Sequence, residues 1–243
     1  GAELAGDPRL VRSAERTRAS ELAVMAATDV TLLVSAAEKE QLALDAPQVK
    51  VELLSNLHEV AGQGLDWAQR HDLVFVGGFR HPPNLDAMQW FIGEVFPRIR
   101  VQLPDVRFHC IGADVPEAIQ ALAAACPGVI VHGYVPDVVP YMEQARLAVA
   151  PLRYGAGVKG KVNLSMAHGQ PVVATSCGVE GMFLRDGQDV RVADEAQAFA
   201  DAVVQLYADP VLWQRLSDNG LHNIARHFSM EAAQAAVTRV FFD

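Results

Sequence analysis

LAVAPLRYGAGVKGKVNLSMAHGQPVVATSCGVEGM, residues 147–182, is the stretch of this chain that decides its fold. Residues 147–152 and 171–175 are short apolar runs, typical of strands that are covered on both faces. A glycine loop and a short amphipathic segment lie between them. The stretch therefore predicts a strand, a helix and a second, parallel strand, which is the repeating unit of an α/β protein with a doubly wound, Rossmann-like sheet.

The loop Gly155–Gly157 is a candidate anion site. Its glycines allow positive φ angles and close approach of a ligand, and the predicted helix begins directly after it. Lys159 and Lys161 fall in the first helical turn, where the helix dipole already places positive charge, so the two cations favour an anion there. The alternative is that the lysines are solvated and the glycines only form turns. We predict a phosphate site.

The segment GAGVKGKVNLSMAHGQPVVAT, followed by GVEGM, resembles the donor-binding segment of the group 1 glycosyltransferases, a retaining class with the two-domain GT-B fold. The resemblance covers residues 29–242 and is most specific over residues 151–182. It implies a transferase that binds a nucleotide-diphosphate sugar and acts in polysaccharide, O-antigen or other glycoconjugate biosynthesis. Two family glutamates, one near the transferred sugar and one on the ribose, correspond to Ala156 and Leu164, so neither acid is present.

The ends of the predicted strands supply the other candidate site residues, because ligands of doubly wound sheets bind there. Arg80 suits a diphosphate, since a guanidinium matches its geometry, although a solvated loop arginine is the alternative. Glu180 is the only acid of the GVEG loop and could instead cap a helix or face solvent. The resemblance implies diphosphate binding by Arg80, Gly155, Ala156, Gly157, Lys159 and Lys161, and nucleotide or sugar binding by Gly78, Gly133, Tyr134, Val135, Leu164, Ser165 and Glu180.

Leu164 also leads to an expectation about the donor. A leucine removes the family's acceptor for the ribose hydroxyls, and an unpaired buried hydroxyl costs about 1 to 3 kcal/mol. We therefore expect thymidine-diphosphate sugars to be favoured over UDP- and GDP-sugars, with Asn163 or Ser165 meeting the 3′-OH. The missing acids also leave open a non-catalytic binding or interaction module. A nucleotide-sugar epimerase of related architecture fits less well.

Composition limits the kinds of partner. The chain has 243 residues, of which 51% are apolar and 20% charged, which suffices for a real core. The formal net charge of −9 argues against nucleic-acid binding. Cys110, Cys126 and Cys177 lack metal-ligand spacing and suggest reduced thiols in a cytoplasmic protein, Cys110 and Cys177 in strand-like contexts. We find neither a membrane-spanning apolar run nor a signal-peptide pattern. Peripheral membrane association remains open.

The histidines are not arranged like a catalytic or metal centre. His109 lies inside a predicted strand and is interpreted as a hydrogen-bonded core residue, whereas His81 and His168 lie near the candidate site. No histidine pair with a carboxylate has metal-ligand spacing, so we predict no metal, and no cofactor beyond the nucleotide-sugar substrate. Familiar nucleophile motifs are absent, and no catalytic residue is assigned.

The remaining pattern predicts two unequal domains. Residues 1–60 resemble the end of an acceptor-binding domain, and the polar, glycine-containing stretch around 61–71 is the linker. Residues 72–228 form the donor domain, and residues 229–243 a helix that returns to the first segment. Ser35 and Glu38 predict a capping box. We expect the chain to be a piece of a longer protein that does not transfer sugar alone. Predicted strands cover 29–35, 49–56, 72–79, 107–113, 129–135, 147–152, 171–175 and 189–194; predicted helices cover 8–27, 36–44, 84–101, 116–125, 137–144, 195–208, 210–226 and 229–242.

Overall fold

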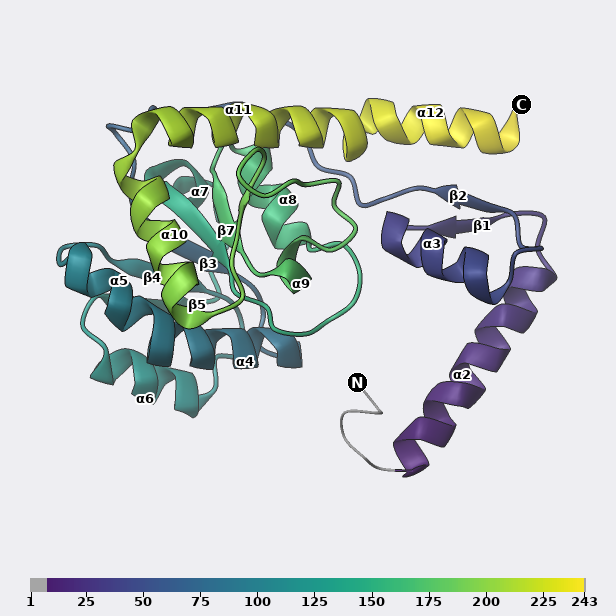
Figure 1. Cartoon of the computed structure of the whole chain (residues 1–243), viewed down its shortest axis with the longest axis horizontal. Helices are drawn as coiled ribbons and strands as arrows, with labels where there is room; N and C mark the ends of the chain where they lie inside the picture. Colours follow the sequence, from purple (N-terminus) through teal and green to yellow (C-terminus); the bar gives the residue numbers. More distant parts are fainter. Residues whose placement is uncertain (1–7, 243) are drawn as a thin grey trace.

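A six-stranded parallel sheet forms the larger part of the molecule (Figure 1). The computed structural model describes residues 8–242. The strands follow the order β5-β4-β3-β6-β7-β8, which reverses between β3 and β6. The carboxyl ends of β3 and β6 are therefore the topological switch point, where such sheets bind ligands. The predicted doubly wound α/β sheet is confirmed. Its strands are β3 (His71–Val76), β4 (Phe108–Ile111), β5 (Val129–Gly133), β6 (Ala145–Ala150), β7 (Val172–Ala174) and β8 (Arg191–Val192).

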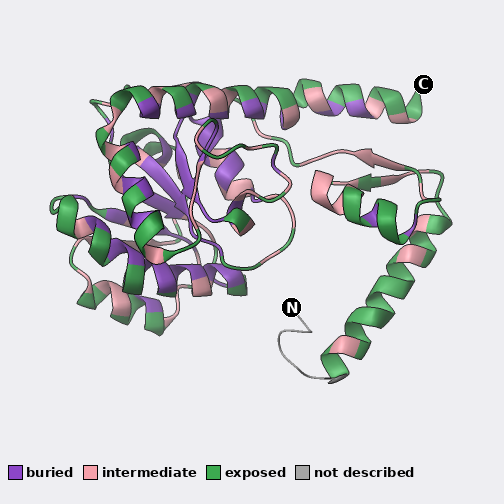
Figure 2. Cartoon of the chain, viewed as in Figure 1, coloured by how far each residue is buried: buried purple, intermediate pink, exposed green. Residues whose placement is uncertain are grey.

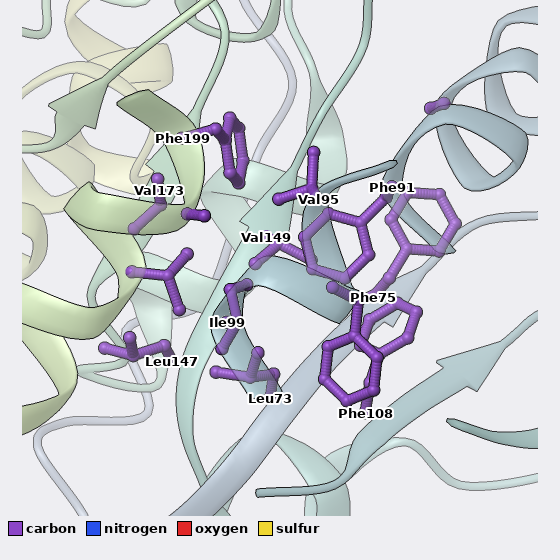
Figure 3. Close-up of a cluster of buried hydrophobic side chains, with 14 of the residues drawn as sticks. Leu73, Phe75, Phe91, Val95, Ile99, Phe108, Leu147, Val149, Val173 and Phe199 are labelled. Carbon is purple, nitrogen blue, oxygen red and sulfur yellow. The ribbon is translucent and has the colours of Figure 1, made fainter. Parts of the chain in front are cut away.

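Helices cover both faces of this sheet because successive strand residues point to opposite sides. Leu73 and Phe75 pack in one buried cluster, shown in Figure 3, whereas Val74 packs in a second cluster on the other face. The first cluster is covered by α4 (Pro82–Trp90), α5 (Phe96–Gln102), α6 (Glu117–Ala125) and α10 (Ala196–Ala208). The second is covered by α7 (Val139–Gln144) and α8 (Gly160–Ala167), and α11 (Pro210–His227) contributes to both clusters.

The predicted helix over 84–101 is not continuous. Residues Phe91–Val95 form a π-helical turn, η1, between α4 and α5. Pro97 follows this turn, and a proline has no N–H to bond the carbonyl four residues earlier. The local ladder widens there, as single π-turns inside α-helices do. Hydrophobic spacing alone did not reveal this interruption.

The N-terminal segment forms a small two-stranded parallel sheet, β1 (Thr31–Leu33) and β2 (Val51–Leu53), with α3 (Ala36–Asp45) between its strands. Helix α2 (Pro8–Ala26) extends away from it and is largely exposed (Figure 2). The C-terminal helix α12 (Met230–Phe241) contacts β2 of the first segment (Figure 1). Ser229 caps α12 as predicted, its Oγ accepting a hydrogen bond from Ala232 N at 3.2 Å.

The segment that connects the two sheets is hydrogen-bonded to the carboxyl ends of helices α8 and α11. The amide of His58 donates to Phe228 O at 2.8 Å, and the amide of Ala61 donates to Ala167 O at 2.9 Å. Arg70 ends this segment and is completely buried, although no carboxylate pairs with it among the described residues. Its guanidinium donates to backbone carbonyls from four parts of the chain. The acceptors are the carbonyl oxygens of Gln63, Leu65, Met142, Ala145 and His168.

Two local predictions are wrong. Ser35 is the N-cap of α3, but its side chain makes no capping hydrogen bond, so the capping box with Glu38 does not form. Cys177 lies in the short helix α9 (Ser176–Val179) instead of a strand, because the strand ends at Ala174 and Thr175 caps the helix. Cys110 is a fully buried core residue of β4.

Candidate functional site

The glycine loop lies at the switch point, between the end of β6 and the start of α8. Gly155 has φ +123° and Gly157 has φ +78°, conformations that side-chain-bearing residues rarely adopt. The loop passes close to the helix that follows β3, because a Cβ added to Gly155 would lie 3.4 Å from Pro83 Cγ. The two loops that follow the central strands therefore meet, as parallel topology requires.

The two lysines of this region are held inside the structure. Lys159 is the N-cap residue of α8, is 8% exposed, and donates from Nζ to Gly155 O at 3.0 Å and Gly157 O at 2.5 Å. Lys161 donates from Nζ to Asn84 Oδ1 at 2.7 Å. Asn84 Nδ2 in turn donates to Gly78 O at 2.7 Å. The alternative of fully solvated lysines does not fit these contacts, because each lysine hydrogen-bonds to a loop or to the residue that holds one.

Positive charge at this site is not compensated by the protein. Among residues 8–242, neither Lys159 nor Lys161 forms an ion pair with a carboxylate. Burial, together with repulsion from Lys159, lowers the pKa of Lys161 from 10.5 to about 8. Both ammonium groups stand at the amino end of α8, where the helix dipole also disfavours cations. A bound anion would relieve all three unfavourable effects at once.

Arg80 reaches the same edge of the sheet but is engaged elsewhere. Its side chain is 86% exposed and its Nε lies 2.9 Å from Asp114 Oδ2. Asp114 follows β4, so the pair spans the ends of two neighbouring strands. Gly78 is exposed beside it, with its carbonyl held by Asn84. The predicted diphosphate role of Arg80 would require the guanidinium to share or leave Asp114.

The turn Gly133–Val135 lies farther along the edge. It follows β5, which β4 and β3 separate from β6, so it does not meet the lysines. Gly133 has φ +69°, and the ring of Tyr134 is 75% exposed. Any ligand that touches both this turn and the glycine loop must therefore extend across the carboxyl ends of β3 and β4.

The GVEG loop adjoins the glycine loop on its other side. Cys177 Sγ contacts Gly155 O at 3.3 Å, and Gly178 is so close to β6 that a Cβ there would lie 2.8 Å from Ala150 O. Glu180 is exposed at the end of α9 and makes no hydrogen bond or ion pair with the described residues. Gly181, with φ +70°, packs against the hydroxyl of Ser35 from the N-terminal segment.

The positions of the two missing glutamates differ in their surroundings. Ala156 is exposed on the glycine loop, whereas Leu164 is half-buried and packs against the second hydrophobic cluster. Asn163 is 0% exposed, and neither polar atom of its amide has a hydrogen-bond partner. Ser165 is 4% exposed and donates to Lys161 O at 3.0 Å. The expectation that Asn163 or Ser165 meets the 3′-OH stays a prediction.

Two residues at the site were not predicted as site residues. Asn84 links Lys161 to the β3 loop, and only its place at the start of a helix after a glycine pair could have indicated it. Glu38 of α3 brings a carboxylate to the glycine loop, where its Oε1 lies 3.8 Å from the position of a Cβ on Gly157. Glu38 had been interpreted only as a cap, because its sequence position does not indicate this contact.

His109 and His132 lie away from the switch point. His109 Nδ1 lies 2.9 Å from His132 Nε2, and its Nε2 lies 3.3 Å from Asp72 Oδ2 near the opposite ends of the strands. Burial of Asp72 opposes ionisation, but hydrogen bonds from His109 and Arg107 outweigh it and lower the pKa of Asp72 to about 2. His109 is thus hydrogen-bonded, as predicted. His81 is exposed, and His168 is buried at the end of α8.

No group of three or more His, Cys, Asp or Glu side chains within residues 8–242 is arranged to hold a metal ion. The predictions of no metal and no cofactor stay predictions. No helix in the same range is both long and apolar enough to cross a membrane.

Comparison with known proteins gives the family. The profile described as "Glycosyl transferases group 1" matches residues 70–209, which is more than half of the 243 residues. The chain belongs to the group 1 glycosyltransferases. The family predicted from residues 147–182 is confirmed, and the matched range contains the glycine loop, both lysines and the GVEG loop.

Sequence relatives of this glycosyltransferase chain match parts of it. An uncharacterised 44.6 kDa protein in the cps region of Klebsiella pneumoniae is 24% identical over 140 residues, which cover 55% of this chain and 36% of the relative. The lipopolysaccharide core biosynthesis glycosyltransferase LpsE of Rhizobium meliloti (strain 1021) is 39% identical over 70 residues, which cover 28% of this chain and 21% of the relative. The matched regions thus span well under half of either relative.

Solved structures confirm the fold. Staphylococcus aureus TarM, in a mutant complex with fondaparinux, α-GlcNAc-glycerol and UDP, has a TM-score of 0.80 at 15% identity, covering 94% of this chain and 47% of that one. WaaG, a glycosyltransferase involved in lipopolysaccharide biosynthesis, has a TM-score of 0.66 at 14% identity, covering 87% and 62%. Likeness at such low identity concerns the fold, and the predicted GT-B-like architecture is confirmed.

Proposed function

We propose that this chain binds the diphosphate of a nucleotide sugar at the glycine loop and serves retaining glycosyl transfer in polysaccharide or lipopolysaccharide biosynthesis. The observation that carries the proposal is the pair of lysines Lys159, which is buried, and Lys161, which is half-buried; neither has a carboxylate partner among the described residues. They stand at the start of a helix at the switch point. Fixed positive charge there stabilises the negative charge that develops on a departing nucleotide diphosphate.

The similar proteins support this donor class. The TarM structure and that of Anabaena HepE both contain UDP, and the R. meliloti relative is named for lipopolysaccharide core biosynthesis. In the proposed complex the amides of Gly155–Gly157 and both lysines meet the diphosphate, while the nucleotide extends toward Gly133–Val135. Lys159 exchanges a loop carbonyl for a phosphate oxygen. The acceptor is a glycan or a lipid-linked glycan, and we expect the 243-residue chain alone to bind donor without turnover.

Calorimetric titration with UDP-, GDP- and dTDP-sugars tests the donor site. Lys159→Ala and Lys161→Ala should each weaken binding about tenfold or more, because each removes a charge-assisted hydrogen bond. Lys50→Ala is the matched control, since Lys50 is exposed and lies outside the site. Unchanged affinity in both site variants would move the diphosphate elsewhere.

A second candidate function is a non-catalytic binding module, which the absence of acids at Ala156 and Leu164 favours. Glu38 argues for the enzyme, because it brings a carboxylate to the loop that lacks one. We propose that Glu38 accepts hydrogen bonds from hydroxyls of the donor sugar.

The two candidates differ in how a sugar changes nucleotide affinity. Glu38→Gln should weaken binding of UDP-glucose or UDP-N-acetylglucosamine about tenfold and leave UDP binding unchanged, because only the sugar meets the carboxylate. Glu40→Gln, an exposed residue of the same helix, should change neither. Failure of the wild-type chain to bind any nucleotide sugar would favour the module.

A further inference from the structure

A second cavity, away from the glycine loop, lies between the N-terminal segment and the C-terminal helices. Its volume is about 270 Å³, which is small for a ligand pocket and suits a compact molecule. Its lining residues come from the ends of β1 and β2, from the start of α3 and from α11 and α12. Val34, Ala36, Leu53, Ser55, Leu57, Phe183, Arg226, His227, Ala236 and Arg239 are among the residues that line it.

The lining is cationic although the chain is acidic overall. Arg226 and Arg239 contribute to it, and it contains no aspartate or glutamate. His227 also lines the cavity, but burial and repulsion from Arg226 and His222 lower its pKa, so its imidazole is neutral at pH 7. Within residues 8–242, neither arginine has an ion-pair partner or a hydrogen-bond acceptor. In a chain with a net charge of −9, two unpaired guanidinium groups around one cavity are a local excess of positive charge. A single guanidinium group can bind a phosphate through two parallel N–H···O hydrogen bonds.

Further donors point to the same anion. The hydroxyl group of Ser55 is shielded from solvent and has no hydrogen-bond partner, which is costly unless a ligand supplies one. Ala36, also in the lining, begins α3, whose first-turn amides lack a capping side chain because Ser35 does not cap. A hydroxyl donor, a helix amino end and two arginines therefore surround one space.

Part of the lining is apolar and includes an aromatic ring. Phe183 stacks on His227 with ring centroids 4.2 Å apart and planes at 15°, and its ring remains 45% exposed. Phe183 also has φ +58°, an unfavourable conformation for a bulky residue that must be held by its surroundings. This side of the cavity suits the carbon face of a small ring.

We propose that this cavity binds a sugar phosphate, with the phosphate between Arg226 and Arg239 and the sugar ring against Phe183. This second site is separate from the donor diphosphate site and does not depend on it. Both the phosphate group and the sugar ring are needed for full affinity. Arg226 and Arg239 are exposed and lack partners, so substituting them leaves folding intact.

Calorimetry on the 243-residue chain at pH 7 and low ionic strength tests the site with glucose 1-phosphate, inorganic phosphate and glucose. We expect glucose 1-phosphate to bind more tightly than inorganic phosphate and glucose not to bind. Arg226→Gln and Arg239→Gln should each weaken glucose 1-phosphate about tenfold. Phe183→Ala should reduce its affinity to that of inorganic phosphate.

Two further variants separate this site from others. Arg215→Gln, on the same helix as Arg226 but outside the cavity, should bind glucose 1-phosphate like the wild type. Lys161→Met should also bind it normally. The proposal is overturned if the wild type binds neither phosphate compound, if both cavity arginines can be replaced without effect, or if Lys161→Met abolishes binding, which would place the phosphate on the glycine loop.

Discussion

Lys161 Nζ donates to Asn84 Oδ1 at 2.7 Å, and this bond joins two helices whose strands lie on either side of the topological switch point. Helix α4 follows β3 and helix α8 follows β6. Asn84 is 4% exposed and its amide also holds the carbonyl of Gly78. One neutral side chain therefore orients the buried ammonium group and one of the loops that surround the candidate anion site.

The neutrality of Asn84 leads to the first prediction. Asn84→Asp places a carboxylate beside Lys161, neutralises the positive charge and adds repulsion against a diphosphate. We expect UDP to bind about tenfold or more weakly, which is the loss of one charge-assisted hydrogen bond. Asn219→Asp adds the same charge at a half-buried position of α11 outside the site and should leave the affinity unchanged. Equal affinities of the two variants in calorimetry would contradict an anion at Lys161.

The pKa of Lys161 gives the second prediction, a pH dependence of donor binding. A pKa of about 8 means that the free site loses its proton as the pH rises past 8. A bound anion favours the protonated form and raises this pKa, so affinity is highest below pH 8 and falls above it. Between pH 7 and pH 9 we expect UDP to bind about tenfold more weakly.

Lys161→Met is the control for this titration, because it removes the titrating group and keeps an apolar side chain of similar length. Its UDP affinity should be lower at pH 7 and should vary much less between pH 7 and pH 9. A wild-type affinity that stays constant over this range would show that the ammonium group of Lys161 does not meet the diphosphate.

Arg70 gives the third prediction, which concerns stability. Burial lowers its pKa from 12.5 to about 10, so it remains charged at pH 7 while backbone carbonyls solvate it. Arg70→Met leaves five buried carbonyl oxygens without this donor, and we expect a loss of about 3 to 5 kcal/mol in the free energy of unfolding. Urea denaturation measures it. Arg215→Met, on an exposed surface, should cost less than about 0.5 kcal/mol.

The order of strands and helices could be predicted because it depends on local pattern. Apolar runs of strand length alternate with helix-length segments, and the GAG loop indicates a turn into a helix. The partners of Lys161 could not be predicted this way, since Asn84 lies 77 positions away in sequence. Glu38 reaches Gly157 only because the N-terminal segment folds back beside the larger sheet. Both contacts depend on tertiary packing, which the periodicity of the sequence does not indicate.

The same distinction explains the errors. The sequence placed Lys159 and Lys161 correctly at the start of a helix, but a helical wheel does not show that loop carbonyls and Asn84 bury them. Ser35 has the sequence of a cap, yet its hydroxyl packs against Gly181 of a distant loop. In each case the side chain makes a tertiary contact instead of the local interaction that was predicted for it.

The fourth prediction concerns the sugar of the nucleotide and depends on Leu164. This residue is half-buried and packs against the second hydrophobic cluster, so the surface that it presents beside α8 is apolar. Asn163 and Ser165, its neighbours, are buried. A ribose 2′-OH placed against Leu164 would lose its hydrogen bonds to water without replacement, at a cost of about 1 to 3 kcal/mol. A deoxyribose has no such group, so we expect dTDP to bind more tightly than UDP.

The base methyl group of dTDP also differs from UDP, so dUDP is the decisive ligand because it changes only the 2′-OH. We expect dUDP to bind about tenfold more tightly than UDP in calorimetric titration. A tenfold difference in affinity corresponds to a free energy within the range of about 1 to 3 kcal/mol given for the unpaired 2′-OH. Leu164→Glu should supply an acceptor and reverse the preference, whereas Leu164→Met should keep it. If UDP binds as tightly as dUDP or more tightly, the ribose does not rest on Leu164, and the preference for deoxynucleotides is wrong.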